Sequence, residues 1–159
     1  MKKQLLYFTF IIIIAFLITG CLFKNDNNKD IIMYELQTHE YFNYLHNIQN
    51  KYYIDSEKEL DIFYSLFSDA IKIDKNYFKE NTVFVHVIEV GSGSDRIKLK
   101  DVNFKNNTVN FSTKVDITEV GTADMACWYL VAIIPNSKLD GISYEGWSKP
   151  SSIDINEYK

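Results

Sequence analysis

The feature that most constrains the fold is an apolar period of two residues in the second half of the chain. Residues 82–90 are mostly β-branched or aromatic, and residues 108–119 alternate between apolar and polar side chains. The apolar members of the second segment are Val109, Phe111, Val115 and Ile117. Successive side chains of a strand point to opposite faces of a sheet. We therefore expect a central strand over 82–90 and a half-buried strand over 108–119.

Turn residues separate these segments and predict how they are connected. Gly91-Ser92-Gly93-Ser94 and residues 105–107 are typical of turns. The segment between them, residues 95–104, is expected to be a strand with a bulge near Asp101, because its alternation slips between Leu99 and Val102. Residues 127–134 predict a further buried strand that ends at Pro135. The four strands together predict an antiparallel meander.

One amphipathic helix precedes the strands. Ser56 and Glu59 stand at the spacing of a capping box, in which each side chain satisfies a free backbone amide of the other residue. Apolar residues then recur at steps of three and four, namely Leu60, Phe63, Leu66 and Phe67. We therefore predict an α+β domain: one antiparallel sheet of four to six strands with a helix over residues 57–67 packed on it.

The N-terminus has the pattern of a secretory signal. Lys2 and Lys3 precede an apolar run over residues 5–18, which is short for a membrane-spanning helix. The run ends in Ile18-Thr19-Gly20-Cys21, which resembles the lipobox of bacterial lipoproteins. That resemblance implies cleavage after Gly20 and a lipidated Cys21. The alternative is an uncleaved N-terminal anchor, and both readings place residues 22–159 outside the cytoplasm.

These patterns divide the chain into four parts. We expect a signal peptide over 1–20, a lipidated polar tether over 21–30, a single folded domain over 31–148 and a loose polar tail over 149–159. The whole chain has a net charge of −4, and loss of Lys2 and Lys3 makes the mature chain −6. An acidic domain is not attracted to an anionic membrane by its net charge, and we see no basic stripe for nucleic acid. With Cys21 lipidated, Cys127 has no disulfide partner.

No set of residues predicts catalysis, a cofactor or a metal. Cys127 and His86 could form part of a nucleophilic set, but both fall in strands expected to be buried. His39 and His46, with Glu35 and Glu40 nearby, could ligate zinc. On a helix, however, the two histidines would lie about 10–11 Å apart along the axis, which is too far for one ion. The glycine–serine turn lacks the lysine and helix of a phosphate-binding loop.

Two aromatic residues near the C-terminus leave a second function open. Tyr144 and Trp147 could form a platform on which a sugar stacks, although aromatic residues in a strand-rich chain are more often core. The alternative function is therefore a lipoprotein that binds a cell-wall glycan or peptide.

The order of these elements resembles a known family. A capped helix is followed by Ile73-Asp74-Lys75-Asn76-Tyr77-Phe78, a strand ending in Val-Gly, a hairpin, a long alternating strand and Trp128-Tyr129-Leu130-Val131-Ala132-Ile133-Ile134-Pro135. This order is similar to that of the PrcB-type domain, named for a subunit of a bacterial surface protease complex, over residues 56–137. The resemblance implies an extracytoplasmic accessory or binding domain and no protease activity.

The meander also predicts a partner-binding surface. Alternate connections of a meander lie at opposite ends, so the turn at 91–94 and the loop at 120–126 share one end. We predict that this end contacts a protein partner through Gly91, Ser92, Gly93, Ser94, Asp95, Thr122, Asp124 and Met125. The leading function is a non-enzymatic accessory lipoprotein that holds a partner at the cell surface.

Overall fold

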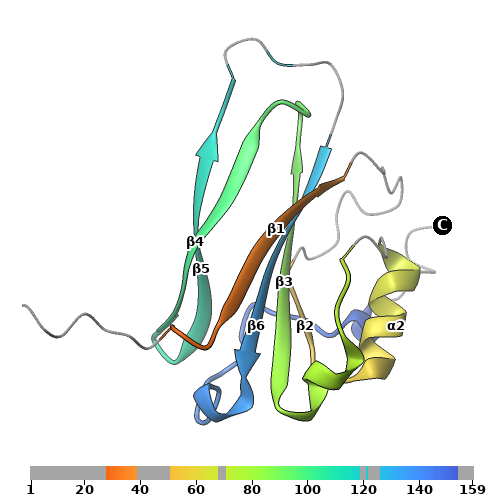
Figure 1. The fold of residues 1–159 in the computed structure, drawn as a ribbon, viewed down its shortest axis with the longest axis vertical. Coiled ribbons are helices and arrows are strands. Elements are labelled where there is room, and N and C mark those ends of the chain that lie inside the picture. Colours follow the sequence, from red (N-terminus) through yellow and green to blue (C-terminus); the bar gives the residue numbers. More distant parts are fainter. Residues whose placement is uncertain (1–27, 39–50, 68–70, 119–120, 122–125, 154–159) are drawn as a thin grey trace, which may run out of the picture.

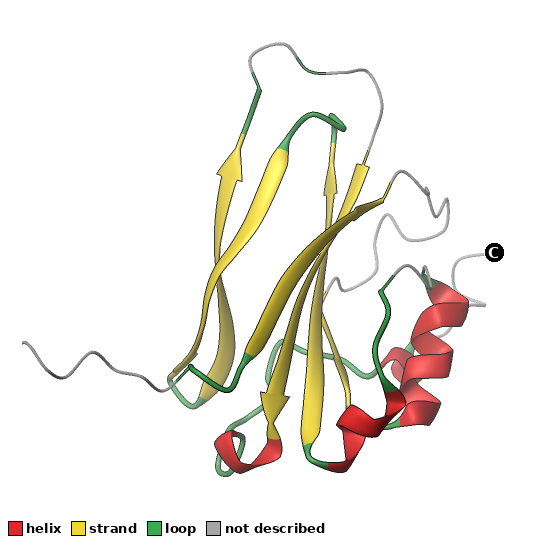
Figure 2. Ribbon diagram, in the orientation of Figure 1, coloured by secondary structure: helices red, strands yellow, loops and turns green. Residues whose placement is uncertain are grey.

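The computed structural model describes residues 28–38, 51–67, 71–118, 121 and 126–153 of the 159 residues. Four antiparallel strands form one sheet in the order β1-β6-β3-β2, and two further strands form a separate hairpin, β4-β5 (Figure 1). The strands are β1 (Ile32–Thr38), β2 (Lys51–Ile54), β3 (Asn81–Val90), β4 (Arg96–Lys105), β5 (Thr108–Asp116) and β6 (Ala126–Pro135). The helices are α2 (Glu57–Leu66) and three short 3₁₀ turns, η1 (Lys75–Lys79), η2 (Asn136–Lys138) and η3 (Pro150–Ser152) (Figure 2).

Strands β3 and β6 form the centre of the molecule because they are apolar on both faces. Val83 and Val85 of β3 point toward the helix α2, whereas Phe84 points toward the β4-β5 hairpin. Residues 126–134 of β6 are buried without exception. Helix, four-stranded sheet and hairpin therefore form three layers, with the four-stranded sheet in the middle.

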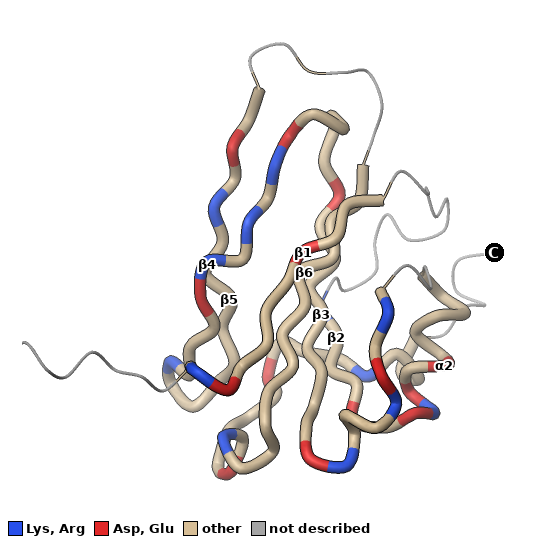
Figure 3. The backbone as a smooth tube through the Cα atoms, viewed as in Figure 1, with Lys and Arg blue, Asp and Glu red and all other residues tan. Residues whose placement is uncertain are grey.

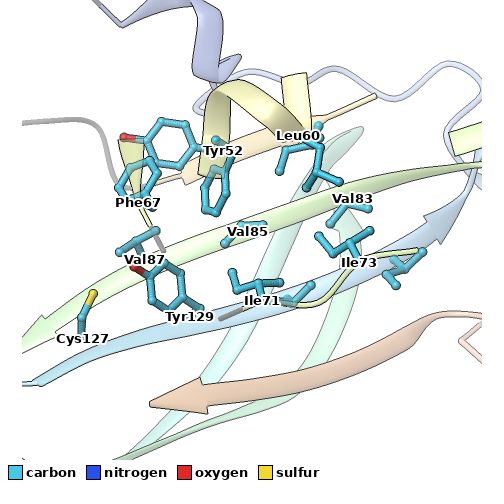
Figure 4. Close-up of a cluster of buried hydrophobic side chains, with 14 residues drawn as sticks. Tyr52, Leu60, Phe67, Ile71, Ile73, Val83, Val85, Val87, Cys127 and Tyr129 are labelled. Atoms are coloured by element: carbon cyan, nitrogen blue, oxygen red, sulfur yellow. The ribbon is translucent and has the colours of Figure 1, made fainter. Parts of the chain in front are cut away.

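Helix α2 covers one face of the sheet through its apolar stripe. Leu60 and Phe63 are fully buried, and the ring of Phe63 lies 5.9 Å from that of Tyr52 on β2. Figure 4 shows this cluster, in which Ile71 and Ile73 continue the cover beyond the helix. The helix begins where the sequence predicts, because the hydroxyl of Ser56 accepts a hydrogen bond from the Glu59 N–H at 3.3 Å.

The β4-β5 hairpin covers the other face. Its inward side chains are Ile97, Leu99, Val102 and Val109, all buried. The register of the hairpin shifts between Leu99 and Asp101, which confirms the predicted bulge. Trp147 fills the space between the layers, and its Nε1 donates a hydrogen bond to the Val109 carbonyl oxygen at 3.0 Å.

The predicted α+β class, with antiparallel strands and one packed helix, is confirmed. The chain passes up and down through β3, β4, β5 and β6 as in a meander (Figure 1), but β3 pairs with β6 and not with β4. The prediction of one sheet is therefore corrected to a sheet and a stacked hairpin. The physical reason is that β4-β5 has one apolar face, and stacking buries that face against the second apolar face of β3 and β6.

The described residues of the predicted tether and tail, 28–30 and 149–153, contact the domain. The side-chain amide of Asn28, placed in the tether, donates hydrogen bonds to Asp101 Oδ1 at 2.6 Å and to the Val102 carbonyl oxygen at 2.8 Å. In the segment predicted as a loose tail, Pro150 is buried and η3 packs on α2. The described fold therefore extends from residue 28 to residue 153. Among the described residues, no helix is long and apolar enough to cross a membrane.

Candidate functional site

The turn after β3 and the segment after β5 lie together at one end of the molecule, as predicted (Figure 1). The Ser94 Oγ lies 2.8 Å from the Thr118 Oγ1, and the carboxylate of Asp95 accepts hydrogen bonds from the N–H of Thr118 at 3.1 Å and from its hydroxyl at 3.2 Å. We call residues 91–95, 117–118 and 121 the loop end. The turn after β3 and the segment after β5 are joined by hydrogen bonds of their side chains and not by strand pairing, since β3 and β5 do not pair with each other.

Hydrogen bonds within the turn fix its shape. The Asp95 N–H donates to the Ser92 carbonyl oxygen at 3.2 Å, and the Ser92 and Ser94 hydroxyls lie 2.7 Å apart. Gly121 closes over this pair, since a Cβ added there would lie 2.7 Å from the Ser92 Oγ. The position therefore favours a residue without a side chain, whereas a Cβ at Gly91 would meet no atom within 4 Å.

A second set of contacts ties the turn to strand β1. The Gln37 side-chain amide donates to the Gly93 carbonyl oxygen at 2.7 Å. The Arg96 guanidinium donates to the same oxygen at 3.0 Å and to the Gln37 Oε1 at 3.1 Å. Strand β1 thus supports the turn from the side opposite Thr118. Neither Gln37 nor Arg96 was predicted to belong to this site, because only the three-dimensional pairing of β1 with β6 brings Gln37 there.

Two apolar side chains are exposed, contrary to the expected burial: Ile117 within the loop end and Val115 next to it. Val115 is 49% exposed and Ile117 is 78% exposed. Val115 lies opposite Ile97 on the inward side of the hairpin, yet Ile97 is buried. The lower half of β5 packs on Trp147, whose ring lies 4.9 Å from that of Phe111. Val115 and Ile117 lie further along the chain than Phe111, beyond the part of β5 that Trp147 covers in the described structure. Alternation therefore predicts the face on which these side chains lie but not whether they are buried.

The structure places only some of the predicted partner-binding residues. Gly91, Ser92, Gly93, Ser94 and Asp95 form the turn described above. Thr122, Asp124 and Met125 lie outside the described residues, as does the predicted lipidation site, Cys21. The loop end is therefore defined by five of the eight predicted residues, together with Ile117, Thr118 and Gly121.

The possible nucleophilic set does not assemble. Cys127 points to the helix face with Tyr129, whereas His86 follows Phe84 on the hairpin face and its ring lies 6.5 Å from that of Phe111. Burial, followed by the negative charge of Glu89, raises the pKa of the Cys127 thiol to about 12. Burial, followed by the Lys51 ammonium, lowers the pKa of His86 to about 4. At neutral pH neither group has the charge that a thiolate–imidazolium pair requires.

The possible metal and sugar sites gain no support from the geometry. His39, His46 and Glu40 lie outside the described residues, and the Glu35 carboxylate accepts a hydrogen bond from the Leu99 N–H at 2.7 Å. Within the described ranges, no three His, Cys, Asp or Glu residues cluster as metal ligands. Trp147 is only 7% exposed, and its ring packs edge-on against that of Phe84 with the ring centroids 4.9 Å apart, so it does not offer a stacking platform.

A scan against protein-family models, a search of curated proteins and a search of solved structures each found no match to this chain.

Proposed function

We propose that this protein is a membrane-anchored extracytoplasmic lipoprotein whose folded domain is a non-enzymatic accessory that holds a protein partner at the loop end. The anchor is inferred from the lipobox-like Ile18-Thr19-Gly20-Cys21. The resemblance to the PrcB-type domain supports an accessory role, and the partner class that it implies is a surface protease complex. The separation of Cys127 from His86 on opposite faces of the sheet gives no support to a hydrolase.

The observation that carries the proposal is the exposure of Ile117 and Val115 beside a hydrogen-bonded turn. Large apolar side chains that remain exposed at one place mark a surface that another molecule covers. The turn next to them is already held by Asp95, Thr118 and Gln37, so little conformational entropy is lost when a partner binds. A rigid polar rim around an apolar centre is the usual arrangement of a protein–protein interface.

Exchange of the exposed isoleucine tests this surface. Ile117→Asp should abolish co-purification of the partner after cross-linking on membranes, since a buried, unpaired carboxylate opposes association. The fold should be retained, with a change within about 0.5 kcal/mol, because the side chain is exposed. Ile32→Asp is the matched control, as Ile32 is also exposed and belongs to the opposite end of β1 from Gln37. Equal partner recovery with both variants would place the interface elsewhere.

The anchor has its own test. Mass spectrometry of the mature N-terminus should show a lipid-modified Cys21, and Cys21→Ser should release the chain from membranes or leave it unprocessed. An unmodified cysteine in the mature, membrane-bound protein would exclude this part of the proposal.

A further inference from the structure

The net charge of the chain conceals a strongly uneven distribution. The hairpin, from Arg96 to Asp116, contains five basic and two acidic residues, which gives it a charge of +3. Since the whole chain carries −4, the rest of the chain carries −7. Four of the five basic residues lie on β4, and the fifth, Lys114, lies on β5 (Figure 3). The net charge of the whole chain therefore does not describe the charge of the hairpin.

Three lysines give the hairpin an exposed basic face. Lys98 lies opposite Lys114 in the register, so both point away from the core, and Lys100 at the bulge is also exposed. We call Lys98, Lys100 and Lys114 the hairpin basic face. Like charges directly opposite each other are unfavourable in a sheet, so the Lys98–Lys114 pair is not explained by stability.

Two carboxylates, Asp101 and Asp116, share the outward side of the hairpin with these lysines, since Asp101 pairs with Ser112 and Val102 beside it points inward. The Lys114 Nζ lies 2.6 Å from the Asp116 carboxylate. That hydrogen bond, together with the charges of Lys114, Lys98 and Lys100, lowers the pKa of Asp116. Within the described ranges, no carboxylate lies at ion-pairing distance from Lys98 or Lys100. The face therefore retains a surplus of positive charge toward solvent.

The N-terminal chain enters the domain next to this face. Asn28 is bonded to Asp101 and Val102 on β4, one residue beyond the bulge. Lys98 lies three residues from Asp101, which is about 10 Å along a strand. The point at which the anchored segment joins the fold is thus closer to the hairpin than to α2, which lies on the opposite layer (Figure 1).

The length of the anchored segment limits how far the hairpin can stand from the lipid. Six residues separate Cys21 from Asn28, and the seven Cα–Cα steps between them span at most about 25 Å when fully extended. The nine residues of β5 alone extend over about 30 Å. A domain held at the middle of the hairpin by so short a connection brings one of its long sides to the bilayer. At physiological salt, screening limits the attraction between the lysines and the lipid headgroups to distances of about 8 Å.

We infer that the hairpin basic face lies against anionic lipid headgroups, so that the domain rests on its side on the membrane. This inference rests on the lipid anchor in the proposed function. The loop end, which is at one end of the hairpin, then faces along the membrane surface and not away from it. A partner that docks there is one that is itself held at the membrane.

The test uses the full chain purified from membranes and reconstituted into two kinds of vesicle. One is made of phosphatidylcholine, and the other contains about one third phosphatidylglycerol to supply negative headgroups. Acetylation of each lysine is followed by mass spectrometry. Lys98, Lys100 and Lys114 should react several-fold more slowly on the anionic vesicles. Lys58 on α2 and Lys79 on η1 are exposed internal controls, and they should react equally on both vesicles. Salt at 1 M should remove the protection, since it shortens the screening length to about 3 Å.

Each other outcome overturns the inference or a named part of it. Equal reactivity of all five lysines on both vesicles would exclude the orientation, even if the protein floats with the vesicles. Failure to float with neutral vesicles would instead exclude the anchor. If soluble polyphosphate slows acetylation of Lys98, Lys100 and Lys114 and anionic vesicles do not, the face binds an anionic polymer and not a membrane. The variant Lys98→Gln/Lys114→Gln should lose the remaining protection at Lys100, whereas Lys58→Gln/Lys79→Gln, with the same loss of charge, should keep it.

Discussion

The carboxylate of Glu59 on α2 accepts two hydrogen bonds from Ser151, one from the backbone N–H at 3.0 Å and one from the hydroxyl at 2.6 Å. Glu59 is buried, and these bonds give its carboxylate two hydrogen-bond donors there. They attach η3, near the end of the described chain, to the helix. The capping-box spacing predicts a contact of Glu59 with Ser56, but not this partner 92 residues away.

Removal of the buried carboxylate should therefore destabilise the domain. Glu59→Ala should lower the free energy of unfolding by about 1.5–3 kcal/mol, because the Ser151 N–H loses a charged acceptor. Glu57→Ala is the matched control, since Glu57 occupies the same turn of α2 but is exposed. Urea unfolding measures both. Similar midpoints for the two variants would mean that η3 does not stabilise the helix.

The helix cap and the helix core should contribute unequally. Ser56→Ala should cost about 1 kcal/mol, because the Glu59 N–H loses its acceptor. Phe63→Ala should cost roughly 3–5 kcal/mol, since Phe63 is fully buried among Tyr52, Phe67 and Tyr129. Ser65→Ala serves as a control on the exposed side of the helix. Urea unfolding should show the largest loss of stability for Phe63→Ala, a smaller loss for Ser56→Ala and the smallest for Ser65→Ala. A negligible effect of Phe63→Ala would contradict the packing of α2 on the sheet.

Stability should fall in mild acid because of His86. Its pKa is lowered to about 4 in the folded chain, whereas an imidazole in the unfolded chain has a pKa near 6.5. Between these values the unfolded chain binds a proton that the folded chain does not. The free energy of unfolding should therefore decrease as the pH falls from 6.5 to 4, by on the order of 2 kcal/mol after allowance for solvent at this half-buried site.

His86→Phe should remove that part of the pH dependence. Phenylalanine does not titrate and can pack beside Phe111, which already lies near the imidazole. The other two histidines are present in both proteins, so the difference between their urea-unfolding curves isolates His86. If both proteins lose the same stability between pH 6.5 and 4, His86 is not the group responsible.

Cys127 should behave as a buried thiol. Burial raises its pKa to about 12, so almost none of it is thiolate at neutral pH, and the side chain lies at the edge of the buried cluster near Val87 and Tyr129 (Figure 4). A bulky thiol reagent should modify the native protein at Cys127 far more slowly than the urea-unfolded protein. Mass spectrometry assigns the modified residue. Rapid labelling of Cys127 in the native state would contradict its burial.

The sequence predicts local features well where one segment determines them. Ser56 marks the start of α2, and the slip near Asp101 marks the bulge, because both depend on residues within one or two turns of the chain. The pairing of β3 with β6 does not follow from alternation, since two strands that are apolar on both faces can each pair with several others. The burial of Val115 and Ile117 was wrongly expected for a related reason: alternation gives the face of a strand, whereas cover depends on Trp147, far along the chain.

The candidate site was predicted in part for the same physical reason. In a chain that runs up and down through successive strands, every second connection lies at the same end of the molecule. Residues 91–95 were therefore correctly placed beside the segment after β5. Gln37 was missed because β1 reaches the turn only through its pairing with β6. The hairpin basic face was missed because the net charge averages over the whole chain, whereas the hairpin gathers lysines from two strands.

The two glycines at the loop end provide a test of its shape. Gly121→Ala places a Cβ 2.7 Å from the Ser92 Oγ, so it should disturb the Ser92–Ser94 pair, whose hydroxyls lie 2.7 Å apart. Gly91→Ala adds the same methyl group where no atom lies within 4 Å. Neither glycine has a positive φ, so the two substitutions differ in contacts and not in backbone strain.

Gly121→Ala should therefore weaken partner recovery on membranes several-fold, whereas Gly91→Ala should leave it unchanged. Both variants should unfold in urea within about 1 kcal/mol of the wild type, since the changed positions are exposed. Hydrogen exchange at the Ser94 and Asp95 amides gives a readout that does not need the partner. It should rise in Gly121→Ala alone, because these amides donate to Ser92. Unchanged exchange together with lost binding would show that Gly121 contacts the partner directly, and unchanged binding together with raised exchange would show that the partner does not require the shape of the turn.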